Sequence, residues 1–163
     1  MNKMVKLDPI VESREDHRKL RDKLFKLIDA LQSKDVVSAR KIHDRINALV
    51  GPHFRYEEET LYPALRVFLG EYVDQLLKEN EGVITTARSC SGLLKKDCLT
   101  SEEINQLATL ARILLIHVSN CEGLSILSEK LDKKIIDNLS KNLSVARMFD
   151  VPLLDWAEII RKK

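Results

Sequence analysis

The sequence predicts an all-α protein: an antiparallel up-down four-helix bundle made of two repeated helix pairs, with one or two extra C-terminal helices. Three observations predict this fold. Apolar residues recur at intervals of three and four over four long stretches, which is the period of a helix that buries one face. Only 5 glycines and 4 prolines interrupt the 163 residues. No alternating β-branched run typical of a strand occurs.

The first helix is expected to begin at Pro9 and to end at about Leu31. Asp8 suits the N-cap position, and proline suits the first helical turn because its missing N–H is not needed there. After these residues, a spacing of seven predicts that one face of the helix lies in the core, with Ile10, His17, Leu24 and Leu31 on it.

The second helix is expected to follow the turn "QSKD" and to end between Pro63 and Gly70. Its inward face is predicted from the helical spacing of Ile46, Leu49, Val50, His53, Glu57, Leu61 and Ala64. The pair Gly51-Pro52 lies inside this stretch, and proline removes a backbone donor and clashes with the preceding turn. We therefore expect a kink or a restart of the helix there.

The third helix is predicted from the apolar residues between Val73 and Ala87, and the fourth begins at a capping box, Thr100 to Glu103. Short connections favour antiparallel neighbours. A four-helix domain over 1–131 is therefore predicted, followed by a helical extension over 132–163. The last helix of that extension is expected to begin at a capping Asp150.

Composition and charge narrow the function. The formal net charge is +2 and the basic residues are spread along the chain, so nucleic acid is not an expected partner. No apolar run approaches the ~20 residues that cross a bilayer, so no membrane association is expected. The first residues lack a secretory apolar segment. Together with 3 cysteines, an odd number, this predicts reduced thiols and a cytoplasmic location.

Each of the four helices carries polar residues where its apolar stripe predicts core side chains, namely His17, His53 with Glu57, Asn80, and His117 with Cys121. A buried carboxylate needs a cation, and residues four apart on a helix can bind one ion side by side. Imidazole with carboxylate suits iron, manganese or zinc. His17 and Asn80 lie 63 residues apart, and His53 and His117 lie 64 apart. This near-equal spacing predicts two half-sites related by a pseudo-twofold axis.

The stretch "HFRYEEETLYP" resembles the signature H-x3-E-E-x-x-L-(F/Y)-P of the hemerythrin-like family, the HHE cation-binding domains, and "EDHRKLRDKL" is similar to its first-helix Asp-His element. The likeness covers about residues 10–130. It implies a four-helix bundle that binds two irons through histidines and bridging carboxylates. It also implies oxygen binding, sensing of oxygen, iron or redox state, or protection from oxidants or nitric oxide. By position, His17, His53 and Glu57 would bind the first metal, and His117 would be the ligand of the fourth helix.

The second half of the chain departs from the family pattern. Asn80 stands where the family has histidine, Ile84 where a second histidine is frequent, and Cys121 where glutamate is expected. Glu122 has the H-x4-D spacing of oxygen carriers, but an ideal helix turns it about 140° from His117, so it could bind only through a π-type bulge. Three alternatives stay open: a di-iron centre completed by Glu122 or Cys121, a single metal, or no tight metal binding. A cysteine in such a place is either a thiolate ligand or a small apolar residue.

The sequence therefore predicts a metal-binding protein, with iron first and zinc or manganese as alternatives, that takes a small diatomic ligand such as oxygen or nitric oxide. No nucleophile–base pair or phosphate loop points to a hydrolytic enzyme. The alternative is a regulatory or structural module that docks a partner or dimerises through the C-terminal helix around Trp156. His43 is expected at the surface. Glu58 and Glu59 are expected to face solvent or pair with Arg55, with the alternative that Glu58 accepts a hydrogen bond from a ligand histidine.

Overall fold

The structure is a computed structural model that describes residues 6–161. Its elements are α1 Pro9–Gln32, α2 Val36–Tyr56, the π-helical segment η1 Glu57–Leu61, α3 Tyr62–Leu69, α4 Tyr72–Leu94, α5 Ser101–Glu122, α6 Leu124–Ser128, α7 Lys133–Phe149 and α8 Leu153–Arg161. No strand occurs within the described range. The prediction of an all-α fold is confirmed.

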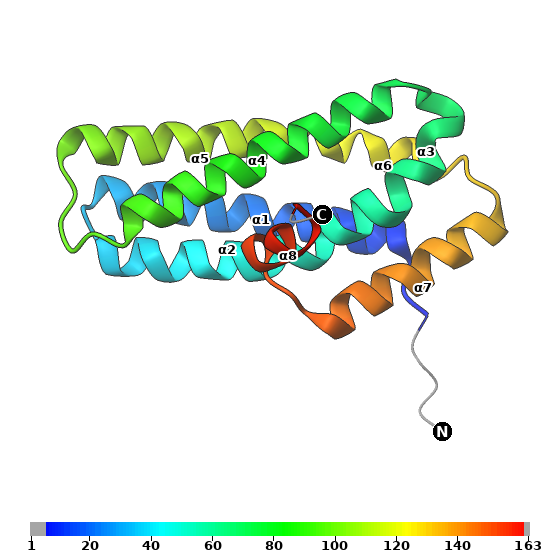
Figure 1. Cartoon of the computed structure of the whole chain (residues 1–163), viewed down its shortest axis with the longest axis horizontal. Helices are drawn as coiled ribbons and strands as arrows, with labels where there is room; N and C mark the ends of the chain where they lie inside the picture. The colour runs from blue at the N-terminus through cyan, green and yellow to red at the C-terminus, as the bar shows by residue number, and fades with distance from the viewer. Residues whose placement is uncertain (1–5, 162–163) are drawn as a thin grey trace.

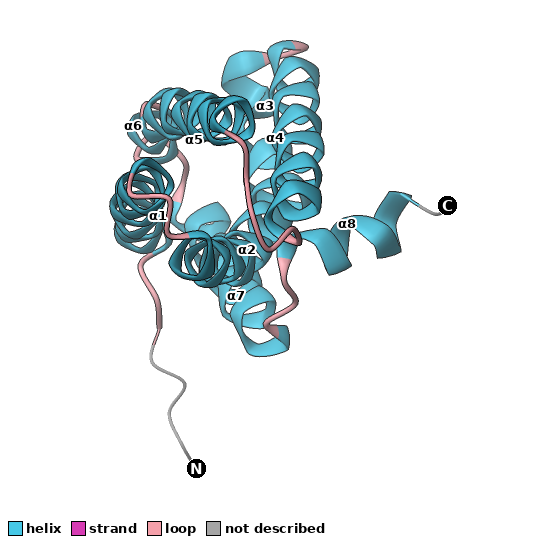
Figure 2. Cartoon of the chain, turned by 90° about the vertical axis from the view of Figure 1, so that its left-hand side faces the viewer, coloured by secondary structure: helices cyan, strands magenta, loops and turns pink. Residues whose placement is uncertain are grey.

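The four long helices α1, α2, α4 and α5 run alternately in opposite directions (Figure 1). Seen along their axes, they surround a common interior (Figure 2). Helix α1 packs along both α2 and α5, whereas α4 and α5 touch over fewer residues. The two C-terminal helices α7 and α8 lie against the outside of α2, and α8 also reaches α4.

Helix ends follow the capping residues in the sequence. The Asp8 carboxylate accepts hydrogen bonds from the N–H groups of Ile10 and Val11 at the start of α1. The predicted capping box of α5 is complete between Thr100 and Glu103. The prediction for Asp150 is wrong: this residue ends α7 in the left-handed conformation, at φ 46°, and α8 begins only at Leu153. An aspartate tolerates that conformation and satisfies the end of the preceding helix.

Gly51-Pro52 does not restart a helix, since α2 continues through both residues to Tyr56. Gly51 lets the backbone of residues 151–153 lie close to α2. A Cβ atom at residue 51 would lie 2.0 Å from the Val151 carbonyl oxygen and 2.7 Å from the Leu153 nitrogen. Next to this contact the Leu154 N–H donates to the Asn47 side-chain oxygen at 3.0 Å. The missing side chain therefore lets the α7–α8 connection lie directly on α2.

Two apolar clusters build the core, and both include residues of the C-terminal helices. The first joins α1, α2, α4 and α5 and takes in Leu153, Trp156 and Ala157 of α8. The second surrounds η1, α3 and the start of α4 and takes in Leu139, Leu143 and Ala146 of α7. Along α2 and η1, the first cluster gives way to the second at the polar residues described next. The C-terminal helices thus share their core with the four long helices.

Within the described residues, one stretch, Ser101–Ser128, is long and apolar enough to cross a membrane when judged by length and composition alone. It comprises α5 and α6, and Ile113 and Ile116 on it are exposed. In the bundle α5 packs along α1. That the chain avoids membranes, and that it resides in the cytoplasm, stay predictions.

Candidate metal centre

Three buried donor side chains meet where α1 faces the end of α2. They are His17 on α1, His53 on α2 and Glu57 at the start of η1, and one donor atom from each lies within 4.8 Å of the other two. The His17 and His53 Nε2 atoms are 3.1 Å apart, and the His53 Nε2 lies 3.0 Å from the Glu57 Oε1. Donors bound tetrahedrally at 2.0–2.2 Å from one ion are about 3.4 Å from each other. The three side chains are therefore spaced as ligands of a single metal ion.

The π-helical segment adds a fourth residue, Tyr62, to this group. In an α-helix a residue five positions after Glu57 would point about 140° away from it. The Tyr62 N–H instead bonds the Glu57 carbonyl, five residues back, which brings the ring above the glutamate. The buried Tyr62 hydroxyl donates to the Glu57 Oε2 at 3.0 Å. Pro63, which has no N–H to offer the α-helical pattern, follows directly and favours this local change.

Opposite charges stabilise the group when no metal is bound. Burial lowers the pKa of His53, but the carboxylates of Glu57 and Asp16 outweigh burial and raise it to about 10. Burial likewise raises the pKa of Glu57, and the neighbouring His53 outweighs it and lowers that pKa overall. Burial and the charge of His53 lower the pKa of His17 to about 4. A bound metal would supply the positive charge that otherwise comes from the His53 proton.

Two further residues support the ring of His53. Its Nδ1 lies 3.3 Å from the Oδ2 of Asp16, which precedes His17 on α1. Asp16 in turn accepts hydrogen bonds from Arg147 of α7 at 3.1 and 3.2 Å. Burial would raise the pKa of Asp16, but His53 and Arg147 hold it below its ordinary value. The His17 Nδ1 is buried and makes no hydrogen bond to any described residue. A buried polar atom without a partner is rare in folded proteins.

The second half of the bundle offers a different set of contacts. Asn80 is fully buried, and its Nδ2 donates to the Glu57 Oε2 at 3.4 Å. His117 and Cys121 contact each other, with 3.3 Å between Nε2 and Sγ, and lie outside the three-residue group. Burial raises the pKa of the Cys121 thiol, and the charge of Glu57 adds to the effect. This thiol is therefore held in its neutral form.

A family model, the hemerythrin HHE cation-binding domain, matches residues 8–124, which is most of the chain. The chain belongs to the hemerythrin family. No curated protein and no solved structure gives a significant match. The matched residues span α1 to the first residue of α6, so the resemblance carried by "HFRYEEETLYP" is confirmed, while α7 and α8 lie outside the match.

Only some of the residues predicted as ligands lie together in the structure. The structure brings together His17, His53 and Glu57, whereas His117 and Cys121 contact each other and lie outside this group. Glu122 does not enter the site. Helix α5 keeps its α-helical form up to this residue, and its half-exposed carboxylate lies 3.8 Å from Arg21 at the surface. The π-helical step that Glu122 would need to reach the metal is absent from α5, and the described residues have such a step at Glu57–Leu61.

Two other expectations from the sequence are wrong. His43 is buried, not at the surface, because it faces α4, where it hydrogen-bonds the Ala87 backbone; burial lowers its pKa despite the nearby charge of Asp44. Glu58 is largely buried and pairs with Arg161 of α8 at 3.4 Å. The sequence of the second helix alone does not predict this partner, because Arg161 lies on another helix. Glu59 does pair with Arg55, as expected, at 3.2 Å.

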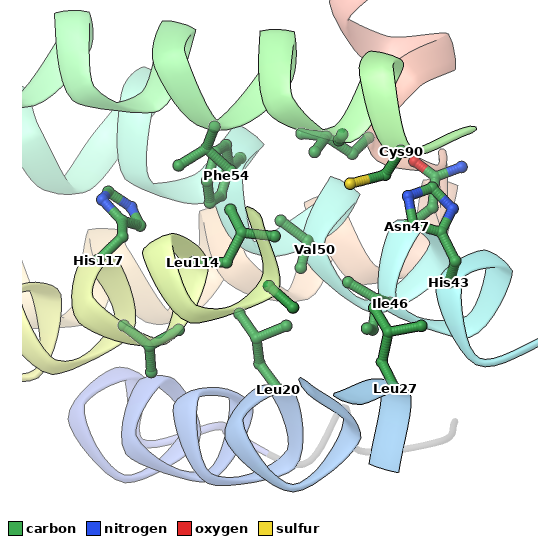
Figure 3. Close-up of a pocket in the computed structure, with 15 residues that line it drawn as sticks. Leu20, Leu27, His43, Ile46, Asn47, Val50, Phe54, Cys90, Leu114 and His117 are labelled. Atoms are coloured by element: carbon green, nitrogen blue, oxygen red, sulfur yellow. The ribbon is translucent and has the colours of Figure 1, made fainter. Parts of the chain in front are cut away.

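A narrow apolar cavity lies inside the bundle, lined by Phe54 and His117 but by none of the three candidate ligands. Figure 3 shows His117 and Phe54 near one end, and His43, Asn47 and Cys90 at the other. The volume open to the centre of a water-sized sphere is about 30 Å³, and the lining is almost wholly apolar. A dry cavity of this kind accepts small apolar molecules in preference to water.

Proposed function

We propose that the chain binds one divalent metal ion, iron foremost, through His17, His53 and Glu57. The spacing of these three donors carries the proposal, because two nitrogens and a carboxylate oxygen already lie at ligand-to-ligand distances. Two histidines with one carboxylate and open coordination positions are typical of non-haem Fe(II). Zinc and manganese accept the same donors.

The contacts of Glu57 support one ion over two. In a dinuclear centre its second oxygen would bridge to another metal. That oxygen, Oε2, instead accepts hydrogen bonds from Tyr62 at 3.0 Å and from Asn80 at 3.4 Å. His117 and Cys121, which would have to supply the second half-site, pair with each other at 3.3 Å.

Bound iron with open positions supplies affinity for a small ligand such as oxygen or nitric oxide. The protein supplies the surroundings. Asp16 holds the Nδ1 of His53 and so leaves the Nε2 toward Glu57. The apolar cavity lined by His117 and Phe54 offers a water-poor space for a diatomic molecule near the group, although none of the three candidate ligands lines it. These features support a role in sensing, storing or resisting such ligands, more than in hydrolysis.

The alternative is a metal-free regulatory or structural module on the same fold. One observation favours it: the carboxylates of the polar group have cationic partners without a metal, since a protonated His53 lies between Glu57 and Asp16 and Arg147 pairs with Asp16. The two proposals differ in metal content, which a single experiment measures.

The test is anaerobic titration of the metal-free protein with Fe(II), followed by determination of iron per chain and spectra recorded with and without nitric oxide. About one iron per chain, abolished by His53→Ala and kept by His43→Ala, supports the proposal. His43 is the matched control because it is a buried histidine of the same helix outside the group. Two irons per chain would restore the dinuclear alternative. No iron at excess metal would leave the structural module.

A further inference from the structure

The C-terminal helix α7, outside the hemerythrin match, places one charged residue next to the candidate metal centre. The Arg147 guanidinium reaches α1, where it donates to both oxygens of Asp16 at 3.1 and 3.2 Å and to Glu12. It is only partly exposed, whereas the Asp16 side chain is buried. A helix added to the family fold therefore contributes a cation to the polar core.

Asp16 connects that cation to the candidate ligand. Its Oδ2 accepts from Arg147 at 3.2 Å and lies 3.3 Å from the His53 Nδ1. A carboxylate on the second nitrogen of a ligand histidine fixes its tautomer and the direction of its ring. A buried carboxylate needs an opposite charge to stay ionised in place, and the fork of an arginine can bind and orient it at two points.

We propose that Arg147 is a positioning residue of the metal centre, which acts through Asp16 on the ring of His53. The inference rests on the proposed function, in which His53 binds the metal ion. It makes α7 a part of the site: docking of α7 on α1 and α2 sets the Asp16 carboxylate, and the carboxylate sets the His53 Nε2 toward Glu57. Displacing α7 loosens the site without removing a ligand.

A second contact of Arg147 supplies the matched control. Its ion pair with Glu12 also joins α7 to α1. Among the described residues, no hydrogen bond or ion pair joins Glu12 to Asp16 or His53. If Arg147 only fastens the helix, loss of either ion pair should act alike. If it positions His53, loss of the Asp16 contact alone should reach the ring.

The experiment compares the whole chain with Arg147→Ala, Arg147→Lys and Glu12→Gln. The first readout, on metal-free protein, is the ring nitrogen–proton correlation spectrum of ¹⁵N-histidine-labelled samples, with His53 assigned by its absence in His53→Ala. The second is Fe(II) affinity by competition with a chelator. We expect Arg147→Ala to shift the His53 ring signals and to weaken iron binding by about 10-fold, the usual effect of removing such an outer partner. Glu12→Gln should do neither, and Arg147→Lys should restore part of both.

Unchanged His53 signals and unchanged affinity in a folded Arg147→Ala protein would overturn the inference. If that variant does not fold, Arg147→Lys against Glu12→Gln decides it, because lysine keeps the charge but loses the two-point grip on Asp16. Failure of the wild-type chain to bind iron refutes the proposed function alone. In that case the His53 signals of the metal-free proteins still decide whether Arg147 sets the ring.

Discussion

Replacement of Gly51 by alanine tests how tightly the C-terminal segment is built into the bundle. The added methyl group would lie 2.0 Å from the Val151 carbonyl oxygen and 2.7 Å from both the Leu153 nitrogen and the Pro152 carbonyl carbon. All three are backbone atoms, so no side-chain rotation can relieve the overlap. Either α2 or the segment that leads into α8 must move.

The size of the effect follows from two opposing contributions. Alanine favours the helix over glycine by about 1 kcal/mol. Moving the segment away exposes Leu153 and Trp156, which are 2% and 4% exposed now. Each such side chain contributes roughly 1.5–3 kcal/mol when buried, so undocking both sets a limit of about 3–6 kcal/mol. The expected net loss of unfolding free energy is therefore at most about 2–5 kcal/mol.

Trp156 is the only tryptophan of the chain, so its fluorescence reports on the docking of α8 directly. Gly51→Ala should shift its emission toward that of an exposed indole and lower the denaturant midpoint. Gly82→Ala in α4 is the control, since a Cβ there meets nothing within 4 Å; it should be neutral or stabilise the protein by up to about 1 kcal/mol. A Gly51→Ala protein as stable as the wild type, with unchanged Trp156 emission, would refute the reasoning.

Three further predictions use the buried polar groups. Tyr62→Phe removes the hydroxyl that donates to Glu57 and should destabilise the metal-free protein by about 1–3 kcal/mol in urea denaturation; an unchanged midpoint would contradict the hydrogen bond. Burial lowers the pKa of His43, so below about pH 6.5 this histidine binds a proton in the unfolded chain but stays neutral in the folded chain. Stability should therefore fall as the pH falls, and should fall less steeply in His43→Gln; equal slopes would contradict this. Burial raises the pKa of the Cys90 thiol to about 11, so a thiol reagent should modify the exposed Cys98 first, and equal rates would contradict the packing.

The fold could be predicted almost completely from the sequence because its signals are local. The capping residues Asp8 and Thr100 begin helices where their side chains can accept from the next turn, and both act as predicted. The prediction for Asp150 was wrong because an aspartate two residues before a proline suits a helix start, whereas this residue ends α7 in the left-handed conformation. The prediction for His43 was wrong because the sequence of α2 alone does not show that α4 covers that face of the helix.

The candidate site could be predicted in part, for a related reason. His53 and Glu57 are four residues apart, so the geometry of one helix nearly fixes their contact. Tyr62 could be recognised only as part of a motif, because its approach to Glu57 depends on the π-helical step. Arg147 lies 131 residues from Asp16, and no local pattern connects two residues that meet only through the docking of α7.

Charge in the polar core gives a further argument for a single ion. Two divalent ions would bring four positive charges into a low-dielectric interior, where uncompensated charge is costly. Asp16 pairs with Arg147 and Glu58 with Arg161, whereas Glu57 has no arginine partner among the described residues and is the carboxylate placed to face a metal. Burial raises the pKa of Tyr62 and of Cys121, so neither readily supplies a further negative charge. One ion held by Glu57 and two neutral histidines leaves a smaller excess of positive charge than two ions would, and the neutral side chains of Asn80 and Cys121 in the second half agree with that balance.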